Sequence, residues 1–333
     1  MLRSNQFLPA PAVKRRRGYP AARLCVLPTS SANLSIPGHL MSISKRLGKV
    51  MPAIVLSPSL AVVTVCVYGF IAYTALLSFT GSRMFASFNF VGWRQYGRLF
   101  ENPRWITAIE NMAIFGILYI VGATCLGLFI AILIDQRIRF EGVFRAVFLY
   151  PMALSFVVTG VIWQWLLNPG LGLEHMMREL GWTSFTFQWL IQPDRAIYTI
   201  VIAGVWQVTG FVMALFLAGL RGVDTEILRA ARIDGAPIHK VYMRIIIPAL
   251  RPAFLTVFVI EAHLAIKSYD LVVALTKGGP GVSTELPSTF MYSMTFTRNE
   301  LAIGAASATV MLVTLASIII PYLYSELRHE PTT

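Results

Sequence analysis

Apolar residues dominate six long stretches of the chain, and polar residues fill the segments between them. The stretches cover residues 54–79, 106–134, 146–167, 198–220, 249–275 and 301–324. A helix needs about 20 predominantly apolar residues to cross the hydrocarbon core of a bilayer. All six stretches reach this length, so the pattern predicts six transmembrane helices joined by short loops.

Charged residues are concentrated in the fifth of these spans. The first, third, fourth and sixth spans contain no Asp, Glu, Lys or Arg, and the second holds only Glu110 near its start. The fifth span contains Arg251, Glu261, Lys267 and Asp270. Ionisable side chains within a membrane are costly, and they usually line a path or pair with one another. The fifth span is therefore predicted to have a functional face.

The composition agrees with a membrane protein and excludes several other classes. Hydrophobic residues make up 56% of the 333 residues, charged residues make up 13%, and the mean hydropathy is +0.65. Soluble domains have about 25% charged residues, so an ordinary soluble enzyme, a disordered chain and a coiled coil are excluded. Cys25, Cys66 and Cys125 form no close pair, so the sequence predicts neither a disulfide framework nor a zinc site.

The distribution of positive charge predicts the orientation of the spans. The formal net charge is +12, and no acidic residue precedes Glu101. With the N-terminus in the cytoplasm, 19 Lys and Arg residues lie on inner segments, eight lie on outer loops, and Lys267 lies within a span. Cytoplasmic loops are enriched in Lys and Arg, so both termini are predicted to be cytoplasmic. The basic excess then reflects membrane topology, and nucleic-acid binding is not expected.

The two ends of the chain are predicted to be tails outside the membrane domain. Residues 1–50 contain no Asp or Glu and include a basic run at 14–17, which favours a disordered cytoplasmic tail. Two alternatives are open: residues 1–40 are an untranslated extension before a start at Met41, or the segment is an organelle transit peptide. Residues 51–326 form the predicted six-span domain, with a cytoplasmic loop at 221–248, and residues 327–333 form a cytoplasmic C-terminal tail.

The cytoplasmic loop between the fourth and fifth spans has the pattern of two short helices. Asp224 or Thr225 can cap a first helix over residues 226–233, and Gly235 after it suits a left-handed C-cap. A proline two residues later prevents a simple continuation, and a second helix is predicted over residues 239–247. The product is an elbow of two helices that projects from the membrane. A loop that only joined two spans would not need such an elbow.

The residues of the elbow follow a recognisable spacing. The pattern Glu-Ala-Ala, three residues, Gly, nine residues and Ile-x-Leu-Pro is typical of the coupling loop in membrane subunits of binding-protein-dependent ABC importers, and the elbow resembles it. The matching positions and their neighbours are Glu226, Arg229, Ala230, Ala231, Asp234, Gly235, Ile245 and Pro248. Arg229 stands where the family usually has Glu. Either Glu226, about one turn earlier, supplies the carboxylate that contacts the partner, or this contact is absent.

Three further segments are similar to sugar-importing members of that family. Residues 271–292, LVVALTKGGPGVSTELPSTFMY, contain the Leu-Thr-x-Gly-Gly-Pro stretch of those members. Residues 90–115 are similar to their first outer loop and second helix, and residues 301–312 match the small-residue start of their last helix. The resemblance covers residues 54–326 and is closest to subunits of glucose- and mannose-type importers.

The resemblance implies an all-α, six-span permease subunit in the bacterial cytoplasmic (inner) membrane, which imports a sugar, with a monosaccharide such as glucose or mannose expected. The implied partners are a second six-span permease subunit, an ATP-binding subunit dimer, an extracytoplasmic sugar-binding protein and membrane lipid. ATP and magnesium would bind the partner ATPase, because this chain has no Gly-x-x-x-x-Gly-Lys-Ser/Thr phosphate loop. The chain is therefore expected to be a transport subunit without a cofactor, and not an enzyme.

A candidate substrate path combines polar and aromatic residues from three spans. Its members are Trp163, Gln164, Trp206, Gln207, His263, Lys267 and Asp270. At 100° per residue the last three would fall within about 60° of one another on one helix face, with Glu261 pointing the other way. The alternative is that Lys267 and Asp270 form an ion pair that only holds helices together. A proton-coupled secondary transporter that uses the charged fifth span is the rival function, but it would not need the elbow.

The charge count makes the orientation testable. Cysteines placed near Gly170 and near Gly281 should react with membrane-impermeant thiol reagents in intact cells, because both positions fall on predicted outer loops. A cysteine near Pro237, on the elbow, should react only after the membrane is permeabilised. Labelling near Pro237 from outside intact cells would show that the predicted orientation is inverted.

Overall fold

The computed structural model describes residues 51, 55–136 and 139–329. The predicted N-terminal tail at residues 1–50, with its alternative start at Met41, lies outside the described residues and stays a prediction. The chain divides into two units, Met1–Val62 and Val63–Thr333, and each is described by itself. In the first unit, Met51 and residues 55–62 are helical. The elements named below belong to the second unit.

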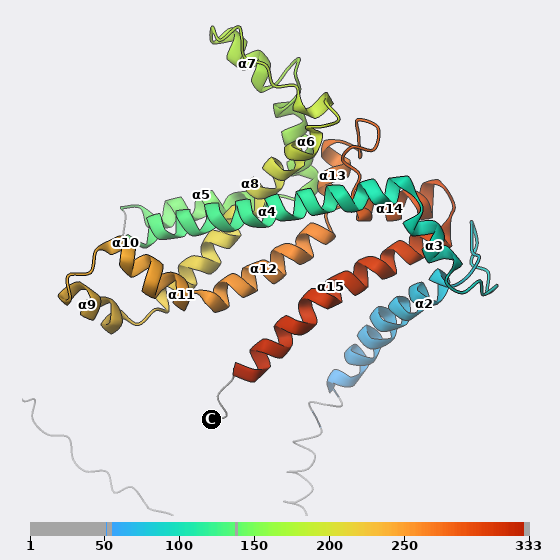
Figure 1. Ribbon diagram of the computed structural model, residues 1–333, viewed down its shortest axis with the longest axis horizontal. Helices are drawn as coiled ribbons and strands as arrows, with labels where there is room; N and C mark the ends of the chain where they lie inside the picture. Colours follow the sequence, from blue (N-terminus) through green and yellow to red (C-terminus); the bar gives the residue numbers. More distant parts are fainter. Residues whose placement is uncertain (1–50, 52–54, 137–138, 330–333) are drawn as a thin grey trace, which may run out of the picture. The chain divides into compact units, whose positions relative to one another are not determined.

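The second unit is built from helices, which Figure 1 shows with their labels. In chain order they are η1 (Thr64–Tyr68), α2 (Gly69–Ser78), α3 (Arg94–Phe100), α4 (Pro103–Asp135), α5 (Glu141–Ala153), α6 (Phe156–Leu166), α7 (Leu173–Glu179), η2 (Trp189–Ile191), α8 (Ala196–Arg221), α9 (Thr225–Ile233), α10 (Ile238–Val241), η3 (Tyr242–Ile246), α11 (Ile247–Ala249), α12 (Arg251–Ile266), α13 (Asp270–Leu275), α14 (Pro287–Tyr292), η4 (Ser293–Thr297) and α15 (Leu301–His329). Among the described residues there is no strand, and Thr80 and Phe90 form an isolated bridge. The predicted all-α class is confirmed.

Helices long and apolar enough to cross a membrane coincide with most of the predicted spans. Among the described residues there are four: Val55–Ser78, Pro103–Asp135, Ala196–Arg221 and Leu301–Tyr324. Two bent helix pairs raise the number to six if each pair is one span: Glu141–Ala153 with Phe156–Leu166, and Ile238–Ala249 with Arg251–Ile266. The polytopic helical architecture is confirmed, whereas the count of six and the cytoplasmic side of both termini stay predictions.

The third span is not the single helix that the hydrophobic pattern predicts over residues 146–167. α5 and α6 are bent by 98° at Leu154. Pro151 lacks a backbone donor in the last turn of α5, and the Ser155 side chain caps α6 by accepting a hydrogen bond from its first turn at 3.2 Å. The Gln207 amide of α8 donates to the Leu154 carbonyl at 2.9 Å. A contact from a distant helix therefore stabilises the break.

The fifth span is interrupted at both ends of α12. The pair of helices on either side of Leu250 is bent by 62°, beside Pro252 in the first turn of α12. α12 ends at Ile266, and after three residues α13 begins and packs against α6. The prediction of one continuous helix over residues 249–275 is therefore wrong. A proline and the packing of α13 on α6 override the hydrophobic pattern.

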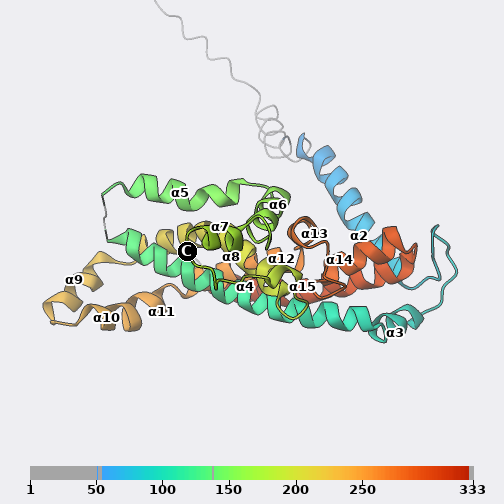
Figure 2. The same ribbon diagram turned by 90° about the horizontal axis from the view of Figure 1, so that it is seen from above.

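α4 and α8 make the most extensive helix–helix contact in the second unit, and they run side by side in Figures 1 and 2. Glycines allow the two backbones to approach closely. A Cβ atom on Gly127 would lie 2.6 Å from Cγ1 of Val212, and one on Gly122 would lie 3.1 Å from Cγ2 of Val205. Lipid tails are as apolar as leucine, so close packing rather than hydrophobicity holds membrane helices together.

Buried side chains join this helix pair to the rest of the second unit. One cluster of buried apolar residues includes Phe115 of α4, Met213 of α8, Val257 of α12 and Leu271 of α13, and it extends into the elbow. A second cluster, around Trp105 and Phe290, joins α3, α4, α14 and α15. The first cluster thus holds both the elbow and the broken spans against α4 and α8.

The glycine contacts predict which substitutions the fold tolerates. A Cβ atom on Gly210 would lie 1.8 Å from the carbonyl oxygen of Phe148 in α5, so Gly210→Ala must push α5 away from α8. We expect a loss of roughly 1–3 kcal/mol in the free energy of unfolding, as for other overpacked cores. The measurement is the thermal unfolding midpoint of the purified protein in detergent.

Gly97→Ala is the matched control for this prediction. Gly97 also lies in a helix, but an added Cβ there meets nothing within 4 Å. Alanine favours helix over glycine by about 1 kcal/mol, so this variant should unfold at the wild-type midpoint or above it. Equal midpoints for the two variants would show that α5 does not pack closely on α8.

Candidate functional site

The elbow between α8 and α12 folds as its sequence predicts. The Asp224 side chain caps α9 by accepting a hydrogen bond from the Glu226 backbone N–H at 2.8 Å. α9 ends at a left-handed Gly235, with φ of 68°, and the Ala236 N–H donates to the Ala231 carbonyl at 3.0 Å. This bond pattern is that of a Schellman C-cap. The second predicted helix, residues 239–247, lies within the consecutive segments α10, η3 and α11.

One side of the elbow belongs to the apolar core. Ala231 of α9, Val241 of α10 and Ile246 of η3 are buried in the cluster that also contains α4 and α8. Of the adjacent alanines in the predicted coupling motif, Ala230 is exposed and Ala231 is buried. Ala231 therefore packs inward and Ala230 faces outward, because neighbouring residues on a helix point in different directions.

The other side of α9 is exposed along its whole length. Glu226, Arg229, Ala230 and Ile233 follow the i, i+3, i+4, i+7 spacing of one helix face and form this outward ridge. Neither Glu226 nor Arg229 forms an ion pair among the described side chains. Arg229 therefore offers an unpaired positive charge at the position where a carboxylate is expected, and Glu226 lies on the same ridge.

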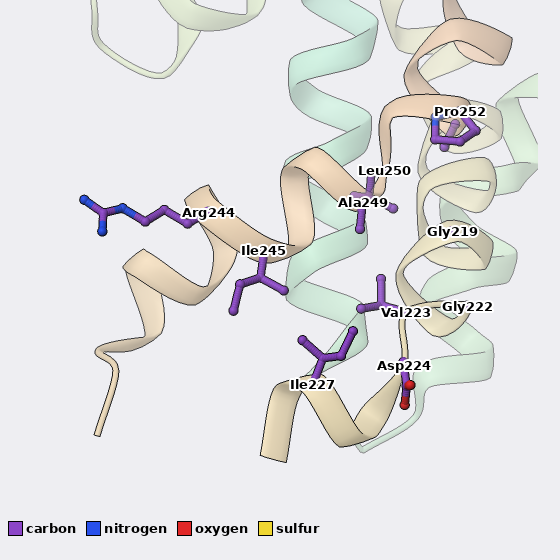
Figure 3. Close-up of a pocket in the computed structure, with 11 residues that line it drawn as sticks. Gly219, Gly222, Val223, Asp224, Ile227, Arg244, Ile245, Ala249, Leu250 and Pro252 are labelled. Atoms are coloured by element: carbon purple, nitrogen blue, oxygen red, sulfur yellow. The ribbon is translucent and has the colours of Figure 1, made fainter. Parts of the chain in front are cut away.

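A cleft of about 560 Å³ lies at the base of the elbow, between α9 and the segment from η3 to α12. Val223, Ile227 and Ile245 point into this elbow cleft, whereas the Arg244 guanidinium extends away from them (Figure 3). Pro248 of the predicted motif is exposed, and Asp234 is exposed at the turn. The cleft therefore separates the two halves of the elbow at their base, and its lining is mainly apolar.

Of the residues predicted to line a substrate path, the two tryptophans contact each other, whereas the two glutamines lie outside that contact. The indole rings of Trp163 on α6 and Trp206 on α8 contact edge to face, with centroids 5.8 Å apart. Both line an apolar groove of about 810 Å³ between α4, α5, α6 and α8. Gln164 is not among its lining residues, and Gln207 is buried, with its amide on the Leu154 carbonyl. Gln207 therefore stabilises the α5–α6 break.

The predicted stripe on the fifth span does not form. His263 lies on α12, Lys267 caps its C-terminal end, and Asp270 begins α13, so the three residues do not share a helix face. All three are exposed, and Lys267 forms no ion pair with Asp270 among the described residues. Glu261 faces α4 instead, where its Oε2 accepts a hydrogen bond from Thr124 at 3.0 Å. The stripe and the alternative ion pair are both wrong, because the helix ends at Ile266.

A partly buried ion pair that the sequence does not predict anchors the loop before α14. Arg104, in the first turn of α4, donates two hydrogen bonds to the Glu285 carboxylate. Asn111 of α4 donates to the Glu285 carbonyl at 3.0 Å. Arg104 and Glu285 are 181 positions apart, and each is a single charged residue in a loop or at a helix end. No local pattern therefore indicates their pairing.

A comparison with known protein families identifies a family whose match covers the elbow and both broken spans. Residues 123–329 match the family described as binding-protein-dependent transport system inner membrane component. This range begins within α4. The chain belongs to this family. A binding-protein-dependent transport component of the inner membrane is a transport subunit and not an enzyme, and the apolar helices agree with a multi-pass inner membrane protein.

Named relatives extend the similarity over most of this transport component. A probable ABC transporter permease protein of Pyrococcus horikoshii is 38% identical over 83% of this chain and 95% of its own length. The xylose/arabinose import permease protein XacH of Haloferax volcanii is 33% identical over 80% of this chain and 84% of its own length. The glucose import system permease protein GlcT of Saccharolobus solfataricus is 26% identical over 78% of this chain and 90% of its own length.

A solved structure has the same fold. It is the crystal structure of a bacterial ABC transporter involved in the import of the acidic polysaccharide alginate. The TM-score is 0.73 at 18% sequence identity, over 88% of this chain and all of the matched chain. At this identity the likeness concerns the fold alone.

The left-handed turn of the elbow predicts a difference between two substitutions. Gly235→Val should destabilise the elbow by about 1–2 kcal/mol, because a β-carbon disfavours positive φ, although there is free space around it. Gly235→Asn should be milder, since Asn adopts this conformation more readily. Hydrogen exchange of the backbone amides in α9 and α10 measures the effect. Equal protection in both variants would contradict the role of the turn.

Proposed function

We propose that this chain is the permease subunit of an ATP-driven sugar importer, and that its elbow transmits the movement of a separate ATPase to the membrane helices. The observation behind this proposal is the apolar tip of the elbow. Ile233 is 86% exposed and Ile238 is 69% exposed, on either side of the turn at Gly235. Large apolar side chains that are exposed together indicate an interaction surface.

The build of the elbow supports this role. Its tip is exposed, whereas Ala231, Val241 and Ile246 are buried in the core shared with α4, α8 and α12. Protein interiors are close-packed and pass on displacements rather than absorbing them. A force on the tip would therefore reach the membrane helices directly. ATP-driven closure of an ATPase dimer would move the elbow and switch the pore between inward- and outward-facing states.

The names of the relatives and the Trp163–Trp206 groove support a sugar as the substrate. The relatives include a xylose/arabinose importer, a glucose importer and a trehalose/maltose importer, which supports a sugar as the substrate. Within this class we propose a monosaccharide, such as glucose or mannose, for this chain. Aromatic faces with a few polar groups are typical of binding sites for small polar ligands. In our proposal the two indole rings border the path.

The remaining partners follow from the same proposal. A second permease subunit would complete the pore, and ATP and magnesium would bind the ATPase subunits. An extracytoplasmic sugar-binding protein would deliver the sugar to the outer loops, of which the loop before α14 is held by Arg104 and Glu285. No observation favours the proton-coupled alternative, because the residues that it needs do not share a helix face.

The docking of the ATPase is tested at the tip of the elbow. Ile233→Asp should leave the membrane helices folded, since this side chain is exposed, but should abolish co-purification of the ATPase subunit. Thr225→Asp is the matched control, because it adds the same charge to α9 in its first turn, where an acidic residue is favourable, and leaves Ile233 in place. If Ile233→Asp retained the ATPase, or if both variants lost it equally, the tip would not be the docking surface.

The substrate is tested separately in whole cells. A strain that lacks the gene for this chain should lose the uptake of one labelled monosaccharide, and the wild-type chain should restore it. Unlabelled sugars of different class, including disaccharides and pentoses, are then offered as competitors. Competition by a disaccharide but not by glucose or mannose would overturn the proposed substrate class and leave the proposed ATPase docking intact.

A further inference from the structure

The segment between α6 and α8 forms a rigid arm, defined here as residues 168–191. Its junction with α6 is tight: the Asn168 side chain accepts a hydrogen bond from the Gly170 N–H at 2.9 Å, and the Gly172 N–H donates to the Asn168 carbonyl at 2.8 Å. A Cβ atom on Gly172 would lie 2.1 Å from the Leu166 carbonyl oxygen, so the backbone turns where only glycine fits. The direction of the arm is therefore set by α6.

Polar contacts hold the arm together along one side of α7. The Glu174 carboxylate is buried and accepts a hydrogen bond from the Phe187 N–H at 3.0 Å. Arg178, one turn later, pairs with Glu174 and donates through Nε to the Phe185 carbonyl at 3.1 Å. The returning segment of the arm thus covers the Glu174 side of α7, and it leaves the opposite side uncovered.

The uncovered side of α7 is apolar. Leu173, Met176, Met177 and Leu180 follow the i, i+3, i+4, i+7 spacing of one helix face. Leu180 is 74% exposed, and its neighbours Leu171 and Trp182 are also exposed, at 83% and 58%. His175 and Glu179, whose Nε2 and Oε1 atoms are 3.2 Å apart, lie away from this face. The arm is therefore amphipathic, and its apolar face has no partner within the described chain.

The position of the arm favours lipid over water or protein. α6 lies at 98° to α5, so if α5 runs across the membrane, α6 runs along its plane, and the arm extends sideways at that level. Figure 1 shows α7 beyond α6, away from α4 and α8. The last turn of α6 exposes Trp165 and Leu166, which lie in a predicted span. The apolar face of the arm continues this exposed apolar surface.

We propose that the apolar face of α7, with Trp182, inserts into the boundary between headgroups and acyl chains and anchors α6 in the plane of the membrane. Amphipathic helices bind there through their apolar face, and Trp is enriched at this depth. Arg178 is neutralised by Glu174, so insertion depends on apolar contact rather than on anionic headgroups. The arm also contacts α8, because Phe187 stacks on Trp189, and Trp189 contacts Tyr198 in the first turn of α8.

The experiment places an environment-sensitive fluorophore on each side of α7 in the full-length chain. Cys25, Cys66 and Cys125 are replaced by serine, and Leu180→Cys is labelled with a nitrobenzoxadiazole dye in phosphatidylcholine nanodiscs. We expect emission at shorter wavelength than in water, and quenching by lipids that bear a nitroxide near the headgroup. His175→Cys is the matched control, on the polar side of the same helix. Its label should emit as in water and be quenched by aqueous iodide.

Three results would overturn the proposal. The Leu180 label could remain open to iodide and unaffected by nitroxide lipids, or both labels could respond alike. The Leu180 label could also leave water only when a binding protein or second permease subunit is added, which would make the face a protein-docking surface. Gly172→Ala provides a further check, since it displaces the arm from α6 and should reduce lipid quenching at Leu180. None of these readouts requires a sugar or an ATPase, so they are independent of the proposed function.

Discussion

The close contact between α4 and α8 is the constraint on which the rest of the second unit depends. Within a bilayer, helices gain little from burying apolar surface against one another, and close approach of the backbones decides which helices pair. Gly127 and Gly122 allow this approach because Val212 and Val205 occupy the space where their side chains would lie. The pair then provides the surface on which α5, α12 and the elbow pack.

This helix pair also determines where the elbow begins. Arg221, at the end of α8, reaches Glu141 at the start of α5 at 2.6 Å. A Cβ atom on Gly219 would lie 2.8 Å from the Leu250 side chain, so the end of α8 and the start of α12 are held in contact at the base of the elbow. The tip at Ile233 and Ile238 is exposed on both sides of its turn, away from this core. A rigid base with an exposed apolar tip suits the transmission of a force.

The two broken spans pack against each other, and their breaks are stabilised by contacts from elsewhere in the chain. Irregular backbone at membrane depth is tolerated only where its polar groups find partners in the protein. Gln207 satisfies the Leu154 carbonyl at the break between α5 and α6, and the Ser288 hydroxyl donates to the Ser268 carbonyl at the break before α13. α13 packs on α6, where a Cβ atom on Gly160 would lie 2.5 Å from Cβ of Ala274. The breaks are therefore stabilised by the same packing that brings the two half-helices together.

The sequence by itself determined the features that depend on local pattern. The apolar runs identify the long helices, and Asp224, Gly235 and the proline that follows it define the elbow, because caps and left-handed turns require particular residues at particular positions. The tertiary structure alone decided where the third and fifth spans break, which member of the Ala230–Ala231 pair is exposed, and that Arg104 meets Glu285. Each of these depends on a partner far away in the chain. The hydrophobic pattern of a span gives the length of the apolar segment. It does not show which distant side chain forms hydrogen bonds with the backbone of that segment, or which one packs beside it.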